Sequence, residues 1–140
     1  MHGSNDLRVG NLMTLDPVVI GPDAPASDAE RLLKTYHVSG LPVVANGAAV
    51  GVISHTDLMV ARSSAMIGGN WPRMRVRHLM SAPAVTVHAA ASSARAAELM
   101  VSRHIHRLVV VDDEDGPIGV LSSLDLLRLL LRDRDIAPGI

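Results

Sequence analysis

The sequence predicts an α/β protein, α+β in stricter schemes, in which one unit of about half the chain is written twice. Three observations support this prediction. The two halves of the 140-residue chain align in register over nearly their whole length. Each half alternates short β-branched runs with helical patterns in the order strand, helix, strand, strand, helix. The chain is 48% hydrophobic and 19% charged, which suits a globular protein with a buried core rather than a disordered chain.

The repeat has an almost constant spacing. A shift of 67 positions pairs Leu12-Met13 with Leu79-Met80, and after one inserted residue a shift of 68 pairs Gly51–Asp57 with Gly119–Asp125. Neither half is long enough to bury its own sheet face well, so the two repeats should pack together. The predicted boundaries are residues 7–62 for the first repeat, 63–73 for a linker and 74–132 for the second repeat.

The first repeat shows its elements in order. The run 18–20 predicts a short strand, and Ser27 with Glu30 has the spacing of a helix capping box. Asn46-Gly47 is a tight-turn signal, which predicts a hairpin between its flanking apolar runs. A second helix is expected from Thr56-Asp57 onward. The hairpin strands are expected at 41–45 and 48–53.

The second repeat follows the same order. Ser92 or Ser93 is expected to begin a helix that runs to about Arg103. A final helix is expected from near Leu124-Asp125 to Leu131, and its leucines exceed one helix face, which predicts a contact in a homodimer. The strands are expected at 84–87, 108–111 and 118–121, with a charged turn at 112–116.

Composition excludes several classes of protein. The formal net charge is −1, so no basic surface calls for nucleic acid, and the arginines near Trp71 are expected to form a solvated linker. The chain has no Cys, which excludes disulfides and thiolate sites and fits a reducing compartment. No apolar run approaches the roughly 20 residues that span a bilayer, and the N-terminus shows no signal region. We therefore expect a soluble cytoplasmic protein.

The twin sequences Gly-Val-Ile-Ser-His-Thr-Asp and Gly-Val-Leu-Ser-Ser-Leu-Asp carry the strongest functional signal. Each joins a strand to a helix, and the Ser and Asp side chains could do no more than cap that helix. The alternative is that they also face a polar ligand. A carboxylate accepts two hydrogen bonds from a ribose diol, and a hydroxyl beside helix N-terminal amides suits phosphate or ribose oxygens. The residues alone leave both interpretations open.

These features together resemble a tandem pair of CBS (cystathionine-β-synthase) domains, the Bateman module, over residues 7–132. The matching segments are Val9–Met13, Val76–Met80, Val38–Val44 and Ile105–Asp112, and the second repeat is similar to the γ subunit of AMP-activated protein kinase. The resemblance implies repeats related by a pseudo-twofold axis, with two clefts between them that bind adenosine nucleotides or S-adenosylmethionine. In such clefts the Asp holds the ribose and apolar side chains sandwich the adenine.

The resemblance also implies which residues would form the two clefts. One cleft would have Val52, Ser54, Thr56 and Asp57 on one wall and Val85, Ile105, His106 and Arg107 on the other. The second cleft would have Val120, Ser122 and Asp125 facing Val18, Val38, Ser39 and Gly40. Leu124 replaces the hydroxyl of Thr56 there, and Ser39-Gly40 replace His106-Arg107. The first cleft is therefore expected to be preferred by phosphorylated ligands.

The functional prediction is a non-catalytic regulatory module that binds an adenine-containing metabolite: AMP, ADP, ATP or S-adenosylmethionine. The sequence contains no catalytic motif of the common hydrolase, phosphate-loop or metal-helix types. No metal or cofactor is expected to be required, because His104 and His106 lack further ligands nearby. The expected partners are a nucleotide, a second copy of the chain and a regulated protein that the sequence does not identify; neither a membrane nor a nucleic acid is expected. The alternative is a dimerisation or protein-interaction module with vestigial clefts.

Overall fold

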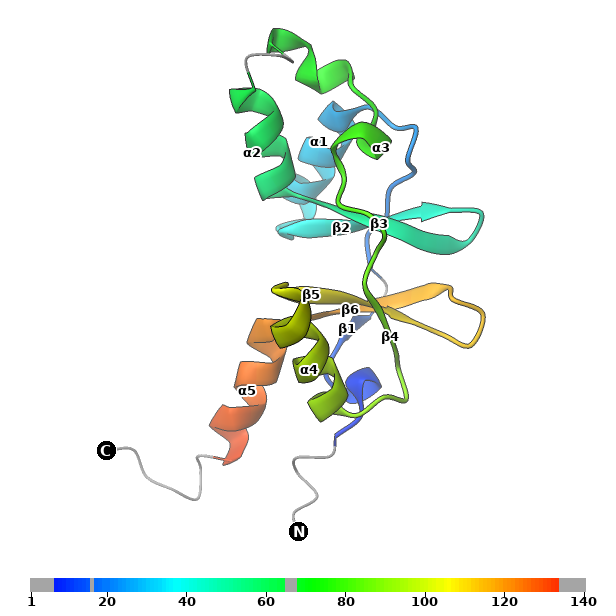
Figure 1. Cartoon of the computed structure of the whole chain (residues 1–140), viewed down its shortest axis with the longest axis vertical. Coiled ribbons are helices and arrows are strands. Elements are labelled where there is room, and N and C mark those ends of the chain that lie inside the picture. Colours follow the sequence, from blue (N-terminus) through cyan, green and yellow to red (C-terminus); the bar gives the residue numbers. More distant parts are fainter. Residues whose placement is uncertain (1–6, 16, 65–67, 134–140) are drawn as a thin grey trace, which may run out of the picture. The chain divides into compact units, whose positions relative to one another are not determined.

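The computed structural model describes residues 7–15, 17–64 and 68–133, and these residues form two compact units (Figure 1). The first-repeat unit comprises residues 17–64, 68–85 and 115–117. The second-repeat unit comprises residues 7–15, 86–114 and 118–133. Each unit combines helices with strands, so the predicted α/β class is confirmed.

The first-repeat unit is built around a β-hairpin. Strands β2 and β3 pair antiparallel, with Gly40 opposite Ser54, and the predicted turn at Asn46-Gly47 has positive φ angles of 53° and 80°. Both long helices lie on the same face of the hairpin (Figure 1). The elements are α1 (Ala26–Tyr36), β2 (Gly40–Ala45), β3 (Ala48–Ser54), α2 (His55–Ser63), η3 (Gly68–Arg73) and α3 (Val76–Leu79).

The second-repeat unit contains a sheet of four strands in the order β1-β6-β5-β4. Strand β1 is antiparallel to β6, and β4 is parallel to β5. The first-repeat unit has the same arrangement in reduced form, because Ser81 bridges Val52 antiparallel and Ile20 bridges Val43 parallel. The elements are η2 (Val9–Asn11), β1 (Thr14–Leu15), β4 (Thr86–His88), α4 (Ser93–Arg103), β5 (Arg107–Val111), β6 (Pro117–Ser122) and α5 (Ser123–Asp133).

The compact units and the sequence repeats divide the chain differently. The segment that opens each repeat packs in the unit formed by the other repeat. The amide of Ala26, at the start of α1, donates to the carbonyl of Met74 at 2.7 Å. At the equivalent place in the other unit, the amide of Ser93 donates to the carbonyl of Leu7 at 2.8 Å. Each long first helix therefore begins on backbone contributed by the opening segment of the other repeat.

The core of each unit is aliphatic, as the near absence of aromatic residues requires. Leu41 and its repeat partner Leu108 are both buried at the starts of β2 and β5. The outer faces of α2 and α5 remain exposed, and among the described residues no helix is both long and apolar enough to span a membrane. The exposed apolar residues on these faces are Met59, Val60, Leu124, Leu127, Leu130 and Leu131.

Three sequence predictions differ from the structure in detail. The strand expected at 18–20 is reduced to a single bridge at Ile20. Ser27 does not cap α1: the N-cap is Pro25, two residues earlier, and the helix begins at Ala26, because Met74 supplies a carbonyl to the Ala26 amide. Glu30 consequently makes no capping box and forms an ion pair with Arg62 instead. The strand expected at 84–87 lies at Thr86–His88.

Candidate functional site

The strand-to-helix turn of the first repeat forms a reciprocal capping box. The Asp57 amide donates to Ser54 Oγ at 3.2 Å, and the Ser54 amide donates to Asp57 Oδ2 at 2.8 Å. Ser54 Oγ also donates to Oδ2 of this carboxylate at 3.0 Å. These bonds satisfy two amides that the start of α2 would leave without partners. The other carboxylate oxygen, Oδ1, receives only a long contact of 3.4 Å from Ser81 Oγ among the described residues.

The second repeat builds the same turn with a different outer contact. The Asp125 amide donates to Ser122 Oγ at 3.1 Å, and the Ser122 amide donates to Asp125 Oδ2 at 2.8 Å. Here Oδ1 accepts a hydrogen bond from Arg128 at 3.1 Å. The capping function that the sequence predicted is therefore present in both repeats. The two carboxylates differ in the partner of Oδ1, the oxygen outside the cap: Ser81 at 3.4 Å for Asp57 and Arg128 at 3.1 Å for Asp125.

The glycine that opens each motif has a packing role. A Cβ at Gly51 would lie 2.7 Å from the Ser81 carbonyl oxygen and 2.8 Å from Met80 Sδ. A Cβ at Gly119 would lie 2.8 Å from the Thr14 carbonyl oxygen, and it would also meet Met13. The opening segment of the other repeat thus passes directly over each glycine. These positions require glycine for space, so neither glycine is evidence for a ligand.

Within each unit, the turn lies beside the residues that precede the hairpin of the same repeat. The His55 amide donates to the Ser39 carbonyl at 3.1 Å, and the Ser123 amide donates to the His106 carbonyl at 2.7 Å. The first-repeat unit holds Val18, Val38, Ser39, Gly40, Val52, Ser54, Thr56, Asp57 and Val85. The second-repeat unit holds Ile105, His106, Arg107, Val120, Ser122 and Asp125. The pairing of walls from different repeats remains a prediction.

A pocket that sequence reasoning missed adjoins Ser39 in the first-repeat unit. Its volume is about 600 Å³, and it lies where the end of α1 meets the start of α2. Its polar lining includes Lys34, His37 and His55, and it contains no carboxylate. Lys34 and His37 lie three residues apart, but His55 lies 18 positions further along the chain, so no short motif joins all three. The complete lining is Leu33, Lys34, His37, Val38, Ser39 and His55.

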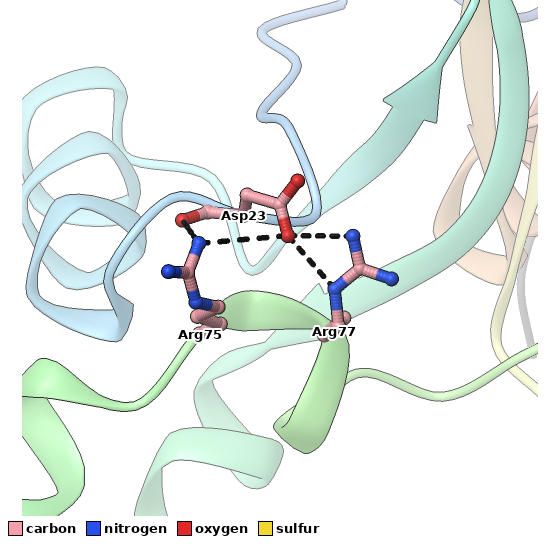
Figure 2. Close-up of polar contacts among 3 residues, drawn as sticks. All are labelled: Asp23, Arg75 and Arg77. Atoms are coloured by element: carbon pink, nitrogen blue, oxygen red, sulfur yellow. Dashed lines mark hydrogen bonds and ion pairs between the residues drawn. The ribbon is translucent and has the colours of Figure 1, made fainter.

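The arginines near Trp71 are held within the first-repeat unit. Figure 2 shows Arg75 and Arg77 on either side of Asp23. Arg77 Nε donates to Asp23 Oδ1 at 2.8 Å, and Arg75 Nη1 lies 3.6 Å from the same oxygen. This cluster joins the start of α3 to the loop before α1. Arg75 and Arg77 are therefore both engaged by Asp23 within this unit.

The two histidines at repeat-equivalent positions end the long first helices. His37 and His104 are the C-cap residues of α1 and α4, with left-handed φ angles of 54° and 55°. A residue in the left-handed conformation is a common way to end a helix, so both histidines have a structural role. Among residues 7–15, 17–64 and 68–133, no group of three or more His, Cys, Asp or Glu side chains is arranged to hold a metal ion.

Comparison with known proteins gives relatives for nearly the whole chain. The chain is 31% identical over 122 residues to inosine-5'-monophosphate dehydrogenase of Methanocaldococcus jannaschii, a match that covers 86% of this chain and 23% of the enzyme. The chain spans 23% to 40% of the length of the first curated relatives that it matches. The dehydrogenase activity therefore does not transfer with this similarity.

Three solved structures share the fold. CBSX2 in complex with AMP is 29% identical with a TM-score of 0.74, and the match covers 91% of this chain and 98% of that one. MJ1225 of Methanocaldococcus jannaschii, a proposed archaeal homologue of the γ subunit of AMP-activated protein kinase, is 25% identical with a TM-score of 0.79, covering 90% and 48%. The CBS domain pair of MJ0100, bound to 5'-methylthioadenosine and S-adenosylmethionine, is 22% identical with a TM-score of 0.81, covering 91% and 98%.

The family assignment rests on both repeats. The model of the CBS domain matches residues 9–64 and again residues 76–132. These two matches coincide with the internal repeat, with the twin capping boxes and with the fold of solved CBS domain pairs. The chain therefore belongs to the CBS domain family and contains two copies of the domain.

Proposed function

We propose that this chain is a non-catalytic regulatory module that binds an adenine nucleotide or S-adenosylmethionine in clefts between its two CBS repeats. The ligand is held by ribose contacts to Asp57 or Asp125 and by apolar side chains around the adenine. No cofactor takes part, and the cytoplasm is the proposed location. The signal passes to a separate regulated protein.

One observation carries this proposal. Asp57 uses Oδ2 for the helix cap and keeps Oδ1 with only the 3.4 Å contact from Ser81 among the described residues. A carboxylate oxygen of this kind can accept a hydrogen bond from a ribose hydroxyl while the cap remains intact. A relative of 29% identity, CBSX2, has been solved with AMP, which supports an adenine nucleotide as the ligand class.

The test is a set of calorimetric titrations of the protein with adenosine, AMP, ADP, ATP and S-adenosylmethionine. Saturable binding of at least one adenine compound is the expected result, with GMP as the control for base selectivity. If none of the five compounds binds, the proposal is overturned and the second candidate function below is favoured.

The proposed clefts give a second, more specific expectation for Arg107. An arginine can pair bidentately with a phosphate, so Arg107→Ala should weaken AMP or ATP binding much more than adenosine binding. Arg107 opens β5 and is half-buried. Equal losses for adenosine and AMP would assign Arg107 a role in the fold rather than at the phosphate.

A second candidate function is that of a dimerisation or protein-interaction module with vestigial clefts. The observation that favours it is the exposed apolar outer face of α5, where Leu127 and Leu130 are 54% and 58% exposed. A face of this kind is typical of an interaction surface. Light scattering at tens of micromolar protein measures the mass in solution, and a homodimer is expected under either function. A monomer at that concentration would contradict the homodimer.

A further inference from the structure

The most informative unassigned feature is the pocket of about 600 Å³ between the end of α1 and the start of α2. It adjoins Val38 and Ser39, which belong to a wall of the second expected cleft. At this wall Ser39-Gly40 replace His106-Arg107, so the sequence pattern provides no cation there. Three of the six lining residues carry nitrogen donors on their side chains: Lys34, His37 and His55. A pocket lined by donors and by no carboxylate is suited to an anionic group.

The charge of Lys34 is only weakly compensated. Its Nζ lies 4.0 Å from Glu30 Oε2, at the limit of an ion pair. Glu30 is engaged more closely by Arg62, whose guanidinium also lies over Trp71 at 4.6 Å from the ring centroid. Because Arg62 already neutralises Glu30, the positive charge of Lys34 remains available to the pocket.

The two imidazoles reach the pocket from different elements. His37 is fixed at the left-handed C-cap of α1, and His55 is the first residue of α2. The hydrogen bond from the His55 amide to the Ser39 carbonyl, 3.1 Å long, ties these elements together. In the part of the chain that the structure describes, neither imidazole has a hydrogen-bond or ion-pair partner. Both rings can therefore donate to a ligand.

The second repeat does not reproduce this combination. Val101 stands in place of Lys34, and Ser123 stands in place of His55, while His104 keeps the helix-end position. The difference is not demanded by the fold, since both helices and both turns are retained. Lys34 and His55 are thus additions to a scaffold that forms without them.

We propose that this pocket binds a phosphoryl group, and that it serves the phosphate of a nucleotide held against Val38 and Ser39. The identity of the nucleotide rests on the proposed function; the anion pocket itself does not. The pocket supplies, from Lys34, His37 and His55, the charge that the sequence pattern lacks at this wall.

The main experiment compares AMP with adenosine in calorimetric titrations of the parent protein, Lys34→Met, His55→Gln and the double variant. Each single change should weaken AMP binding by about 2- to 5-fold, because Lys34 is 70% exposed and its interactions are screened. The double variant should lose about 5- to 30-fold for AMP. Adenosine affinity should stay within about twofold of the parent value.

Arg31→Met is the matched control. Arg31 lies on the same helix, is 65% exposed and pairs with Asp28, but it does not line the pocket. It should leave AMP affinity unchanged. The proposal of a phosphoryl pocket is wrong if Arg31→Met weakens AMP binding as much as Lys34→Met does. It is also wrong if the double variant loses equal affinity for adenosine and for AMP.

A titration with inorganic pyrophosphate, followed by the histidine ring signals in NMR spectra, separates the two proposals. Assignments come from His37→Gln and His55→Gln. Shifts centred on these two rings support the pocket, even if the parent binds neither adenosine nor AMP, in which case only the proposed function fails. If adenosine binds but pyrophosphate shifts the signals of neither ring, the proposed function stands and the pocket proposal is overturned. If no compound binds and no ring signal shifts, both proposals are overturned.

Discussion

The two strand-to-helix turns of this chain have the same backbone plan and different surroundings. In both, a serine caps the helix and an aspartate three residues later bonds back to the serine amide. Beyond the cap, Asp57 meets only Ser81 at 3.4 Å among the described residues, whereas Asp125 is held by Arg128 at 3.1 Å. The helix cap is therefore the feature that both repeats share. The side chains around it determine how available each carboxylate is to a ligand.

The largest expected effect concerns the two carboxylates. Asp57→Ala should weaken nucleotide binding by about 10- to 150-fold, because a hydrogen bond to a charged group contributes about 1.5–3 kcal/mol. Asp125→Ala should cost less, since a ligand there must compete with Arg128 for Oδ1. Calorimetric titration with AMP measures both affinities. Asp57→Asn is the companion variant, because it retains a cap acceptor while removing the charge. Parent-like affinity in Asp57→Ala would end the ribose assignment.

The next largest effect concerns the stability that depends on the glycine opening each motif. Gly51→Ala and Gly119→Ala should each lower the free energy of unfolding by about 1–3 kcal/mol, because the new methyl group meets backbone carbonyl oxygens at 2.7 Å and 2.8 Å. Gly21→Ala is the control, since a Cβ there has no neighbour within 4 Å. Urea denaturation measures all three variants. Losses no larger than that of the control would show that the opening segments can move aside.

These glycines also show where sequence reasoning stops. The internal repeat, the hairpin turn at Asn46-Gly47 and the Ser–Asp spacing were readable, because they depend on local residue chemistry and period. Which opening segment packs on which repeat was not readable. Met13 and Met80 occupy equivalent positions, and each lies over an equivalent glycine. The two opening segments are chemically alike, and so are the two sites that they cover. No local feature of the sequence therefore shows that each segment packs on the other repeat.

The same limit explains the other differences. The start of α1 was misjudged because its amide is satisfied by Met74, a residue 48 positions away in the chain. Lys34 and His37 are neighbours at the end of α1, but His55 joins them only because α1 and α2 meet beside Ser39. Arg128 is different: its spacing of three residues from Asp125 on a predicted helix was a usable signal for their contact.

A smaller effect is expected from the cap hydroxyls. Ser54→Ala and Ser122→Ala should each reduce the free energy of unfolding by about 1 kcal/mol, which is typical of a lost N-cap. Ser54→Ala should be the costlier by a few tenths of a kcal/mol, because Ser54 Oγ also donates to Asp57 at 3.0 Å. Parallel urea denaturation of both variants measures the difference. A reversed order would show that the extra hydroxyl contact adds nothing.

The smallest effect should come from Arg128, whose influence on stability and on binding can be separated. Its pair with Asp125 is a contact within one helix, in which the Arg128 side chain is 62% exposed and the Asp125 side chain 11%. Because the guanidinium is solvated, Arg128→Met should change the free energy of unfolding by less than about 0.5 kcal/mol. The same change releases Oδ1 of Asp125. Adenosine binding to the second repeat should then tighten by about 2- to 5-fold.

The measurement for Arg128 uses Asp57→Ala as the background, so that the ribose contact of the first repeat is absent. Adenosine titrations compare Asp57→Ala alone with Asp57→Ala combined with Arg128→Met. Arg95→Met serves as the control, because Arg95 forms the same kind of three-residue pair with Glu98 on α4. Tighter binding only in the Arg128 variant supports competition between the guanidinium and the ribose for one carboxylate oxygen. Weaker binding would instead make Arg128 a direct ligand contact, because a competitor cannot lower affinity by leaving.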